Sequence, residues 1–417
     1  MQTLKQLNNN ELIGSKELTL RENLTTFPEK IFELADTLEF LDLSNNNLSS
    51  LPDLKRLTKL KFVFFSYNQF REFPTSFKEC HNLYMIGCKA NQIEVMDEDI
   101  LPVNLSWFII TDNKLKSLPN SIGDLTKLKK FSLAGNQLSN LPNTMQKCTS
   151  LELLRLSANK LSNIPEWIAT LPKLSWIAFS GNNCSFDQKS TLKTASLKEL
   201  EIQNKIGEGA SGHIYKVYSP TLEKDVALKL FKGSLTSDGY AMDEMNIYNS
   251  IKTHKNLINI ISTIDEDNQL GLLLDLIPSN YKNLGFPPNF DTCTRDTFPQ
   301  DYTLTSKEIY EISKQVLSVS IHLHEHNITH GDLYAHNILI NEDKHCFLGD
   351  FGAASFYENE NLEKIEVRAF ACLIDDLLQY CSTPNDSYFN LLLNTVEICS
   401  NEDVKKRPFF KEINLMI

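Results

Sequence analysis

A chain of 417 residues with 41% hydrophobic and 23% charged residues has the composition of a globular protein and the length of about two domains. Its net charge of -12 argues against a broad surface for nucleic acid or anionic membrane, because phosphates attract basic faces. The first residues, "MQTLKQLNNN", have no apolar run of the kind found in a signal peptide, and no later run approaches the roughly 18 apolar residues of a membrane helix. The nine cysteines are scattered without paired spacing. We therefore expect a cytoplasmic protein with reduced thiols and no membrane span.

Residues 1–186 contain a leucine pattern that recurs every 22 or 23 residues. The pattern L-x-x-L-x-L-x-x-N-x-L begins at Leu38, Leu60, Leu83, Leu105, Leu128, Leu151 and Leu174. Its motif and period are typical of leucine-rich repeats, whose leucines are buried only when neighbouring turns stack on one another. We predict an α/β solenoid, the leucine-rich-repeat horseshoe, made of seven repeats after an amino-terminal cap, "KELTLRENLTTFP".

Two columns of side chains follow from this periodicity. The first column consists of asparagines, whose amides offer donors and acceptors to backbone groups inside the turns: Asn46, Asn68, Asn91, Asn113, Asn136, Asn159 and Asn182. The second column occupies the third position of each repeat and should point out of the concave sheet: Phe40, Phe62, Met85, Trp107, Lys130, Leu153 and Trp176. Because all but the lysine are apolar, we predict a docking face for a protein substrate or partner. Alternatively, these side chains pack against one another or against the second domain.

A second domain is expected at residues 200–417, after a polar linker at 187–199, "DQKSTLKTASLKE". It begins with "KIGEGASGHIYKVYSP", which places Gly207, Gly209 and Gly212 in G-x-G-x-x-G spacing. Dinucleotide-binding folds use the same spacing, but they need a helix directly after the glycines. Here "HIYKVYSP" and "KDVALKLF" are rich in β-branched and aromatic residues and predict two strands. A glycine-rich hairpin that covers phosphates fits better.

A lysine and a glutamate in the following segments suggest a nucleotide site. Lys229 lies in the second predicted strand, in "VALK", and Glu244 lies fifteen residues later in a predicted helix with apolar residues at helical spacing. Either residue alone is more often an ordinary strand lysine or helix carboxylate. Together, at this spacing, they favour an ion pair that holds the lysine against phosphates.

The motifs in order resemble a protein kinase domain of α+β bilobal fold. "HGDLYAHN" matches the catalytic loop H-x-D-x-x-x-x-N, "GDFG" matches the metal-binding D-F-G, and "RAFACLIDDLL" and "KKRPFF" resemble the large helix and late arginine of the helical lobe. The resemblance implies that Asp332 accepts or orients the substrate hydroxyl, and that Asn337 and Asp350 hold Mg²⁺. It also implies that ATP lies against Lys229, the three glycines and a cleft lined by Ile206, Ile214, Ala227, Asp275 and Ile277.

The second domain departs from the usual kinase pattern in its regulatory parts. Gly331 replaces the arginine that pairs with a phosphate on the activation loop, so we expect no switching by activation-loop phosphorylation. Tyr334 replaces the lysine usual in serine/threonine kinases. No A-P-E sequence follows Asp350, the large helix begins with Glu366 in place of aspartate, and Arg407 lacks its usual glutamate partner.

These residues predict a kinase that uses ATP and Mg²⁺ to phosphorylate protein hydroxyls, with serine and threonine expected as acceptors and the repeats binding the substrate or a partner. Two alternatives remain. The H-G-D form also occurs in small-molecule phosphotransferases of the aminoglycoside and choline kinase type, although the full glycine-rich loop and "VALK" argue against that group. The other alternative is a nucleotide-binding pseudokinase scaffold. The five intact catalytic residues argue against it: Lys229, Glu244, Asp332, Asn337 and Asp350.

Overall fold

The computed structural model of the chain describes residues 1–184, 194–209, 211–236, 238–267 and 269–417. The chain forms two compact units. Met1–Leu171 and Asn182–Cys184 make up the first unit; Pro172–Gly181 and the described residues from 194 onward make up the second. Most of the linker expected at 187–199 lies outside the described residues. From residue 194 its chain joins the second unit, where the Ala195 N–H donates to the Thr263 carbonyl at 2.9 Å.

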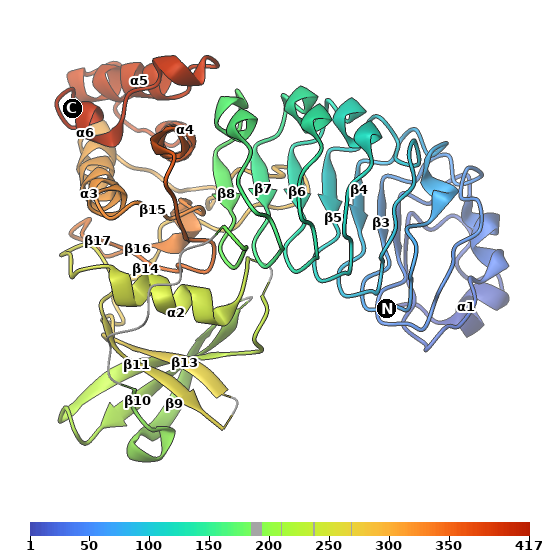
Figure 1. Cartoon of the computed structure of the whole chain (residues 1–417), viewed down its shortest axis with the longest axis horizontal. Coiled ribbons are helices and arrows are strands. Elements are labelled where there is room, and N and C mark those ends of the chain that lie inside the picture. The colour runs from blue at the N-terminus through green and yellow to red at the C-terminus, as the bar shows by residue number, and fades with distance from the viewer. Residues whose placement is uncertain (185–193, 210, 237, 268) are drawn as a thin grey trace. The chain divides into compact units, whose positions relative to one another are not determined.

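The first unit is built from short parallel strands that follow one another in chain order (Figure 1). It begins with helix α1, Leu4–Asn8, which Thr3 caps through its side chain. The strands are β1 Glu17–Thr19, β2 Phe40–Asp42, β3 Phe62–Phe64, β4 Met85–Gly87, β5 Trp107–Ile109, β6 Lys130–Ser132 and β7 Leu153–Arg155. Short 3₁₀ helices alternate with them, at Glu29–Leu34, Thr75–Phe77, Asn120–Asp124, Asn143–Lys147 and Glu166–Thr170. The predicted solenoid is therefore confirmed.

The asparagine column forms the predicted ladder inside the turns. The Asn113 Nδ2 donates to the carbonyls of Cys88 at 3.0 Å and Ile110 at 3.2 Å, and its Oδ1 accepts from the Ile93 N–H at 3.0 Å. Each of the seven amides is buried. Because an amide both donates and accepts, one side chain satisfies backbone groups of successive turns.

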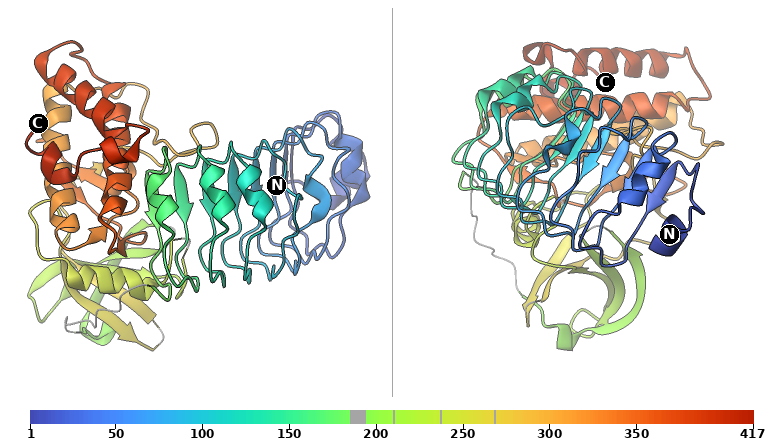
Figure 2. Two further views of the ribbon diagram at one scale, coloured as in Figure 1. Left: turned by 45° about the horizontal axis from the view of Figure 1, so that its top comes forward. Right: turned by 90° about the vertical axis from the view of Figure 1, so that its right-hand side faces the viewer.

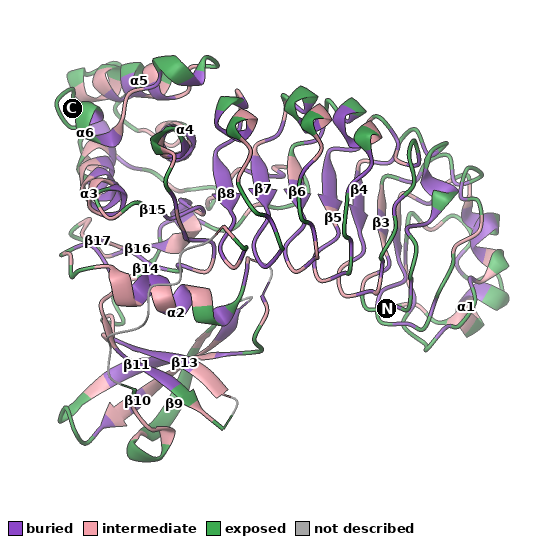
Figure 3. Ribbon diagram, in the orientation of Figure 1, coloured by how far each residue is buried: buried purple, intermediate pink, exposed green. Residues whose placement is uncertain are grey.

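The outward column is only partly exposed. Its members begin strands β2 to β7, and Trp176 begins β8, Trp176–Ala178, which belongs to the second unit. Four of them are buried, namely Met85, Trp107, Leu153 and Trp176. Phe40 and Phe62 keep intermediate exposure. Figure 3 colours residues of intermediate exposure pink along the ribbon. The predicted docking face is thus most accessible at its amino-terminal end.

The small lobe of the second unit is a five-stranded sheet in the order β12-β13-β11-β10-β9. Its strands are β9 Glu201–Glu208, β10 Gly212–Ser219, β11 Lys224–Phe231, β12 Ile260–Glu266 and β13 Gln269–Leu274, and its helix is α2, Ala241–Ser250. Buried apolar residues of strands β10 to β13 form the core: Val217, Val226, Leu228, Ile264 and Leu273. The two strands predicted after the glycines are confirmed as β10 and β11.

The second lobe is mainly helical, and its helices lie together in orange and red in Figure 2. They are α3 Ser306–His324, α4 Glu363–Leu378, α5 Ser387–Cys399 and α6 Phe410–Ile413. Short strands carry the loops of interest: β14 Lys282–Asn283, β16 Ile338–Ile340 and β17 Cys346–Leu348 form one sheet, and β15 Ile328–Thr329 pairs with β18 Ser355–Phe356. In the part of the chain that the structure describes, no helix has the length and apolar character to span a membrane.

Candidate active site

Lys229 lies between two carboxylates. Its Nζ is 2.6 Å from the Glu244 Oε1 and 3.5 Å from the Asp350 Oδ1, and both Lys229 and Glu244 are buried. Strand β11 places the lysine, helix α2 the glutamate, and the loop after β17 the aspartate. Burial favours the neutral amine, but Asp350 and Glu244 outweigh it and raise the pKa of Lys229. The charge of Lys229 in turn lowers the pKa of Asp350.

The loop between β15 and β16 joins Asp332 to Asn337. The Asn337 Nδ2 donates to the Asp332 carbonyl and to its Oδ2, both at 2.9 Å. The His330 ring contacts the Gly349 carbonyl through Nε2 at 2.9 Å, which links this loop to the segment that carries Asp350. Asp332 itself keeps intermediate exposure. Asp332 and Asn337, the first and last polar residues predicted from the catalytic-loop motif, are therefore in direct contact.

Glu366 fixes the backbone of this loop from helix α4. Its carboxylate accepts from the N–H groups of His330 at 3.0 Å and Gly331 at 3.2 Å, and from the Thr329 hydroxyl at 2.8 Å. The His324 Nε2 lies 2.8 Å from the same carboxylate. Burial would raise the pKa of Glu366, but these contacts outweigh it and lower the pKa. Glu366 therefore holds the loop from the first turn of α4, which begins at Glu363 and not at Glu366 as the sequence predicts.

A column of rings connects the two lobes of the second unit. The Phe351 ring lies 4.9 Å from the ring of His330 and 4.8 Å from that of Tyr248, measured between centroids. Tyr248 comes from helix α2, one turn after Glu244, and both Tyr248 and Phe351 are buried. Because α2 carries Glu244 and the loop of Phe351 carries Asp350, this packing helps to bring both carboxylates to Lys229.

The three glycines of the predicted glycine-rich turn lie at the end of β9 and the start of β10. A Cβ on Gly212 would lie 2.6 Å from the Leu230 carbonyl oxygen, so this strand pair requires glycine there. A Cβ on Gly209 would meet no atom within 4 Å, and the Gly209 N–H bonds the Gly212 carbonyl at 3.0 Å. Gly207 pairs with Ile214 across the strands. The turn therefore leaves open space next to its backbone.

The residues predicted to hold a nucleotide base lie on the small lobe and its exit. Ile206 is 48% exposed on β9, whereas Ala227 is buried on β11, where it pairs with Leu274. The Asp275 N–H already donates to the Asn259 carbonyl at 3.0 Å. Among the described residues, the Asp275 carbonyl and the Ile277 N–H have no hydrogen bond, so both are available to an adenine edge.

Asn337 and Asp350 suit a hard cation. The Asn337 amide nitrogen faces Asp332, which leaves its amide oxygen for a metal, and the Asp350 side chain is 53% exposed beside Lys229. Carboxylate and amide oxygens are ligands of Mg²⁺, which usually completes its shell with phosphate oxygens and water. Within the described ranges, no cluster of three or more His, Cys, Asp or Glu side chains could hold a metal by itself.

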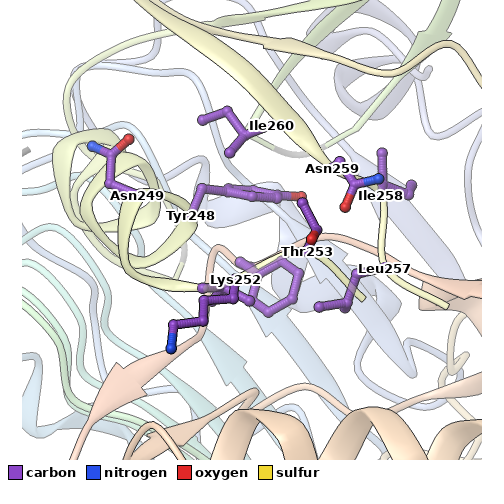
Figure 4. Close-up of a pocket in the computed structure, with 10 residues that line it drawn as sticks. Tyr248, Asn249, Lys252, Thr253, Leu257, Ile258, Asn259 and Ile260 are labelled. Atoms are coloured by element: carbon purple, nitrogen blue, oxygen red, sulfur yellow. The ribbon is translucent and has the colours of Figure 1, made fainter. Parts of the chain in front are cut away.

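Some residues near the site were not predicted. The carboxylate of Asp296 accepts from the His336 N–H at 2.9 Å and contacts the His336 Nδ1 at 2.7 Å. Asp296 lies in an irregular segment outside every motif, so no sequence signal identifies it. A separate pocket of about 370 Å³ lies at the end of α2. Figure 4 shows the Tyr248 ring among the residues that line it. None of its lining residues is a predicted site residue.

Comparisons with known proteins find two kinds of domain in this chain. The family model described as Protein kinase domain matches residues 200–372; those described as Leucine rich repeat match 103–161, 126–184 and 36–79. A stretch covering 36% of the chain is 32% identical to the tyrosine-protein kinase STYK1 of Mus musculus. A stretch covering 37% of the chain is 29% identical to the serine/threonine-protein kinase fray1 of Dictyostelium discoideum. A stretch covering 52% of the chain is 28% identical to a probable L-type lectin-domain containing receptor kinase of Arabidopsis thaliana.

These matches span 37%, 25% and 31% of the relatives' own lengths, respectively. They include both tyrosine and serine/threonine kinases. With the repeat strands and the two-lobed second unit, they confirm the predicted fold class, a leucine-rich-repeat solenoid followed by a kinase-like domain.

Proposed function

We propose that this chain, in which leucine-rich repeats precede a protein kinase domain, transfers the γ-phosphate of ATP to hydroxyl groups of proteins, with serine and threonine as acceptors. The observation that carries this proposal is the arrangement of Lys229. Its ammonium lies 2.6 Å from Glu244 and 3.5 Å from Asp350. A lysine held this way is charged and directed toward the space beneath the glycine-rich turn, as phosphate binding requires.

Each predicted site residue has a role in this reaction. Lys229 binds the α- and β-phosphates, and Glu244 keeps the lysine in position. Asp332 accepts or orients the acceptor hydroxyl, since its carboxylate is exposed enough to meet a substrate. Asn337 and Asp350 hold magnesium, which supplies positive charge against the phosphates when bound. Because phosphoryl transfer needs little covalent chemistry from the protein, positioning and charge account for most of the catalysis.

The nucleotide lies between the two lobes of the kinase domain in this proposal. Ile206, Ile214 and Ala227 contact the base, whose polar edge bonds the Asp275 carbonyl and the Ile277 N–H. Gly207, Gly209 and Gly212 allow backbone N–H groups to approach the phosphates. The Asp275 carbonyl and the Ile277 N–H, which have no hydrogen bond to any residue that the structure describes, support this arrangement.

We further propose that the repeats bind the protein substrate or a partner through the amino-terminal end of the outward column. Phe40 and Phe62 remain partly exposed there, with ring centroids 6.2 Å apart. Aromatic side chains are favoured at protein interfaces because they bury a large area with few rotatable bonds. A cytoplasmic location is proposed as well, since the nine cysteines are scattered without paired spacing in the sequence.

The reaction is tested by incubating the purified full chain with labelled ATP and magnesium, alone and with cell lysate. The Asp332→Asn variant serves as the catalytic control. Label on protein serine or threonine that disappears with this variant supports the proposal. Label found only on small molecules indicates a small-molecule phosphotransferase, and nucleotide binding without any transfer indicates a scaffold.

A further inference from the structure

A ten-residue segment, Pro172–Gly181, carries the leucine pattern of the last repeat but packs within the kinase unit. We call it the repeat-derived segment. It includes strand β8, Trp176–Ala178. Its described contacts reach the catalytic loop, the chain after Asp350, helix α4, the late arginine and helix α2. These are the parts that an activation segment organises in a regulated kinase.

Trp176 makes the closest contact with the catalytic loop. Its indole Nε1 donates to the Leu333 carbonyl at 3.1 Å, and its ring stacks on Tyr334 with centroids 4.3 Å apart and planes 8° from parallel. Tyr334 stacks in turn on His336, with centroids 5.0 Å apart. Trp176 is 1% exposed. The indole therefore covers the backbone that follows Asp332.

Gly331 is a second point at which the segment packs against the catalytic loop. A Cβ at this position would lie 2.4 Å from the Ile177 carbonyl oxygen and 2.6 Å from the Ala353 carbonyl oxygen, and the residue has a φ of +71°. Only glycine tolerates both conditions. Next to it, the Phe179 N–H donates to the Ser355 hydroxyl at 3.0 Å. The replacement of the usual arginine by Gly331 thus makes room for the repeat-derived segment.

The two ends of the segment are fixed by other parts of the kinase unit. The Arg407 Nη2 donates to the Pro172 carbonyl at 2.6 Å, and the Arg368 Nη1 donates to the Ser175 hydroxyl at 2.6 Å. At the other end, a Cβ on Gly181 would lie 2.6 Å from the Asp243 Oδ2, in the first turn of α2. One segment therefore contacts both the helix of Glu244 and the loop of Asp332.

We propose that the repeat-derived segment replaces the phosphorylated activation segment, with Trp176 as the positioning residue that fixes the catalytic loop for phosphoryl transfer. This inference rests on the proposed kinase function. The chain between Asp350 and Glu366 is too short to supply a peptide-docking platform, and Arg407 bonds Pro172 where a kinase would offer it a glutamate. Lys229 and Glu244 are paired, and Asp332 keeps intermediate exposure. We therefore infer that the segment supports catalysis and does not obstruct it.

The test compares Trp176→Ala and Trp176→Phe in the full chain. The control is Trp167→Ala, which changes a tryptophan of the first unit whose indole N–H has no hydrogen-bond partner among the described residues. With myelin basic protein as acceptor, Trp176→Ala should lower kcat about 10- to 100-fold at an unchanged KM for ATP, because a misplaced loop affects transfer more than binding. Trp176→Phe keeps the ring stacking and should lose about threefold.

Two results would overturn the inference. One is a wild-type kcat for Trp176→Ala. The other is a loss of kcat with an equal loss of MgADP affinity in both Trp176→Ala and Trp176→Phe. That result would indicate general unfolding without a positioning role.

A failure of the proposed function is recognised separately. If the wild-type chain and Asp332→Asn both transfer no label, the kinase proposal fails, and amide hydrogen exchange then tests the segment. The positioning role is supported if Trp176→Ala speeds amide exchange in residues 241–250 and 330–337 and Trp167→Ala leaves exchange in both regions unchanged. Unchanged exchange in both regions overturns it.

Discussion

The carboxylate of Glu366 accepts the backbone N–H of His330 at 3.0 Å and so ties the catalytic loop to the large helix α4. It also accepts from Gly331 and from the Thr329 hydroxyl, while the His324 ring contacts it from α3. A buried carboxylate with this many donors holds the loop firmly, because each donor would otherwise remain unpaired in the interior. The position of Asp332 therefore depends on a residue that touches no substrate.

Replacement of Glu366 by glutamine should destabilise the protein and lower transfer. An amide has one oxygen instead of two and would turn its NH₂ group toward one of the donors. We expect the free energy of unfolding to fall by about 2 to 4 kcal/mol. Denaturant unfolding measures this change, and the exposed Glu358→Gln is the matched control. An equal effect in the two variants would contradict the role of Glu366.

The sequence predicts the repeats and the chemistry of the site because both leave local patterns. The leucine pattern recurs at a fixed period, and the three glycines, Lys229 and Asp332 each lie in a short motif. The order of these motifs along the chain indicates one fold class. The sequence predicts Glu366 at the start of the large helix, but it does not predict the bonds from Glu366 to the catalytic loop. Periodicity also assigns Trp176 to the outward column, but it carries no information about a contact with Tyr334, which lies in another domain of the sequence. Asp296, which bonds His336, has no motif at all.

Lys229→Met should abolish most of the transfer activity without unfolding the chain. Methionine fills the apolar part of the lysine site but removes the charge that Glu244 and Asp350 hold. We expect kcat to fall about 10²- to 10³-fold, as when one fixed electrostatic donor is removed from an active site. Initial rates measured at saturating ATP give this value. Lys282→Met, an exposed lysine of β14, should keep the wild-type rate.

Glu308 should make the stability of helix α3 depend on pH. Burial opposes its charge, but hydrogen bonds from the Thr305 N–H and hydroxyl and the contact with Lys344 outweigh burial and lower the pKa of Glu308 in the folded state. A lowered folded pKa gives stability that is present above the unfolded value of about 4.3 and is lost as pH falls through the folded pKa.

Glu308→Gln should therefore cost about 1 kcal/mol of unfolding free energy at pH 7 and progressively less below pH 4. Urea unfolding at a series of pH values measures the difference. Glu311→Gln, on the exposed face of the same helix, is the control. A difference that stays constant down to pH 3 would show that the charge of Glu308 is not involved.

Asn113→Ala should destabilise the first unit from inside its ladder. The change removes the acceptor of the Ile93 N–H, and it removes one of the two asparagine donors to each of the Cys88 and Ile110 carbonyls, which keep Asn91 and Asn136. We expect a loss of about 1 to 3 kcal/mol, mainly the cost of leaving one buried backbone N–H unpaired. Asn140→Ala changes an exposed asparagine of the same unit and should be neutral. Thermal unfolding of the two variants compares them directly.

Phosphatase treatment should leave the activity of the chain unchanged. Ser355 and Tyr357 are the only hydroxyl-bearing residues between Asp350 and Glu366, and both are buried. The Ser355 hydroxyl accepts from the Phe179 N–H at 3.0 Å, and the Tyr357 hydroxyl lies 2.7 Å from the His324 Nδ1. A modifying kinase could reach neither without opening the site.

Ser355→Asp should therefore lower kcat about tenfold, because a carboxylate at this buried position loses its hydration and displaces the Phe179 backbone of the repeat-derived segment. Ser355→Ala, which removes only the hydroxyl, should have a much smaller effect. Rates of the two variants and of phosphatase-treated wild-type protein are measured side by side. Activation by Ser355→Asp, or inactivation by phosphatase, would indicate that this short segment is a conventional phosphorylation switch.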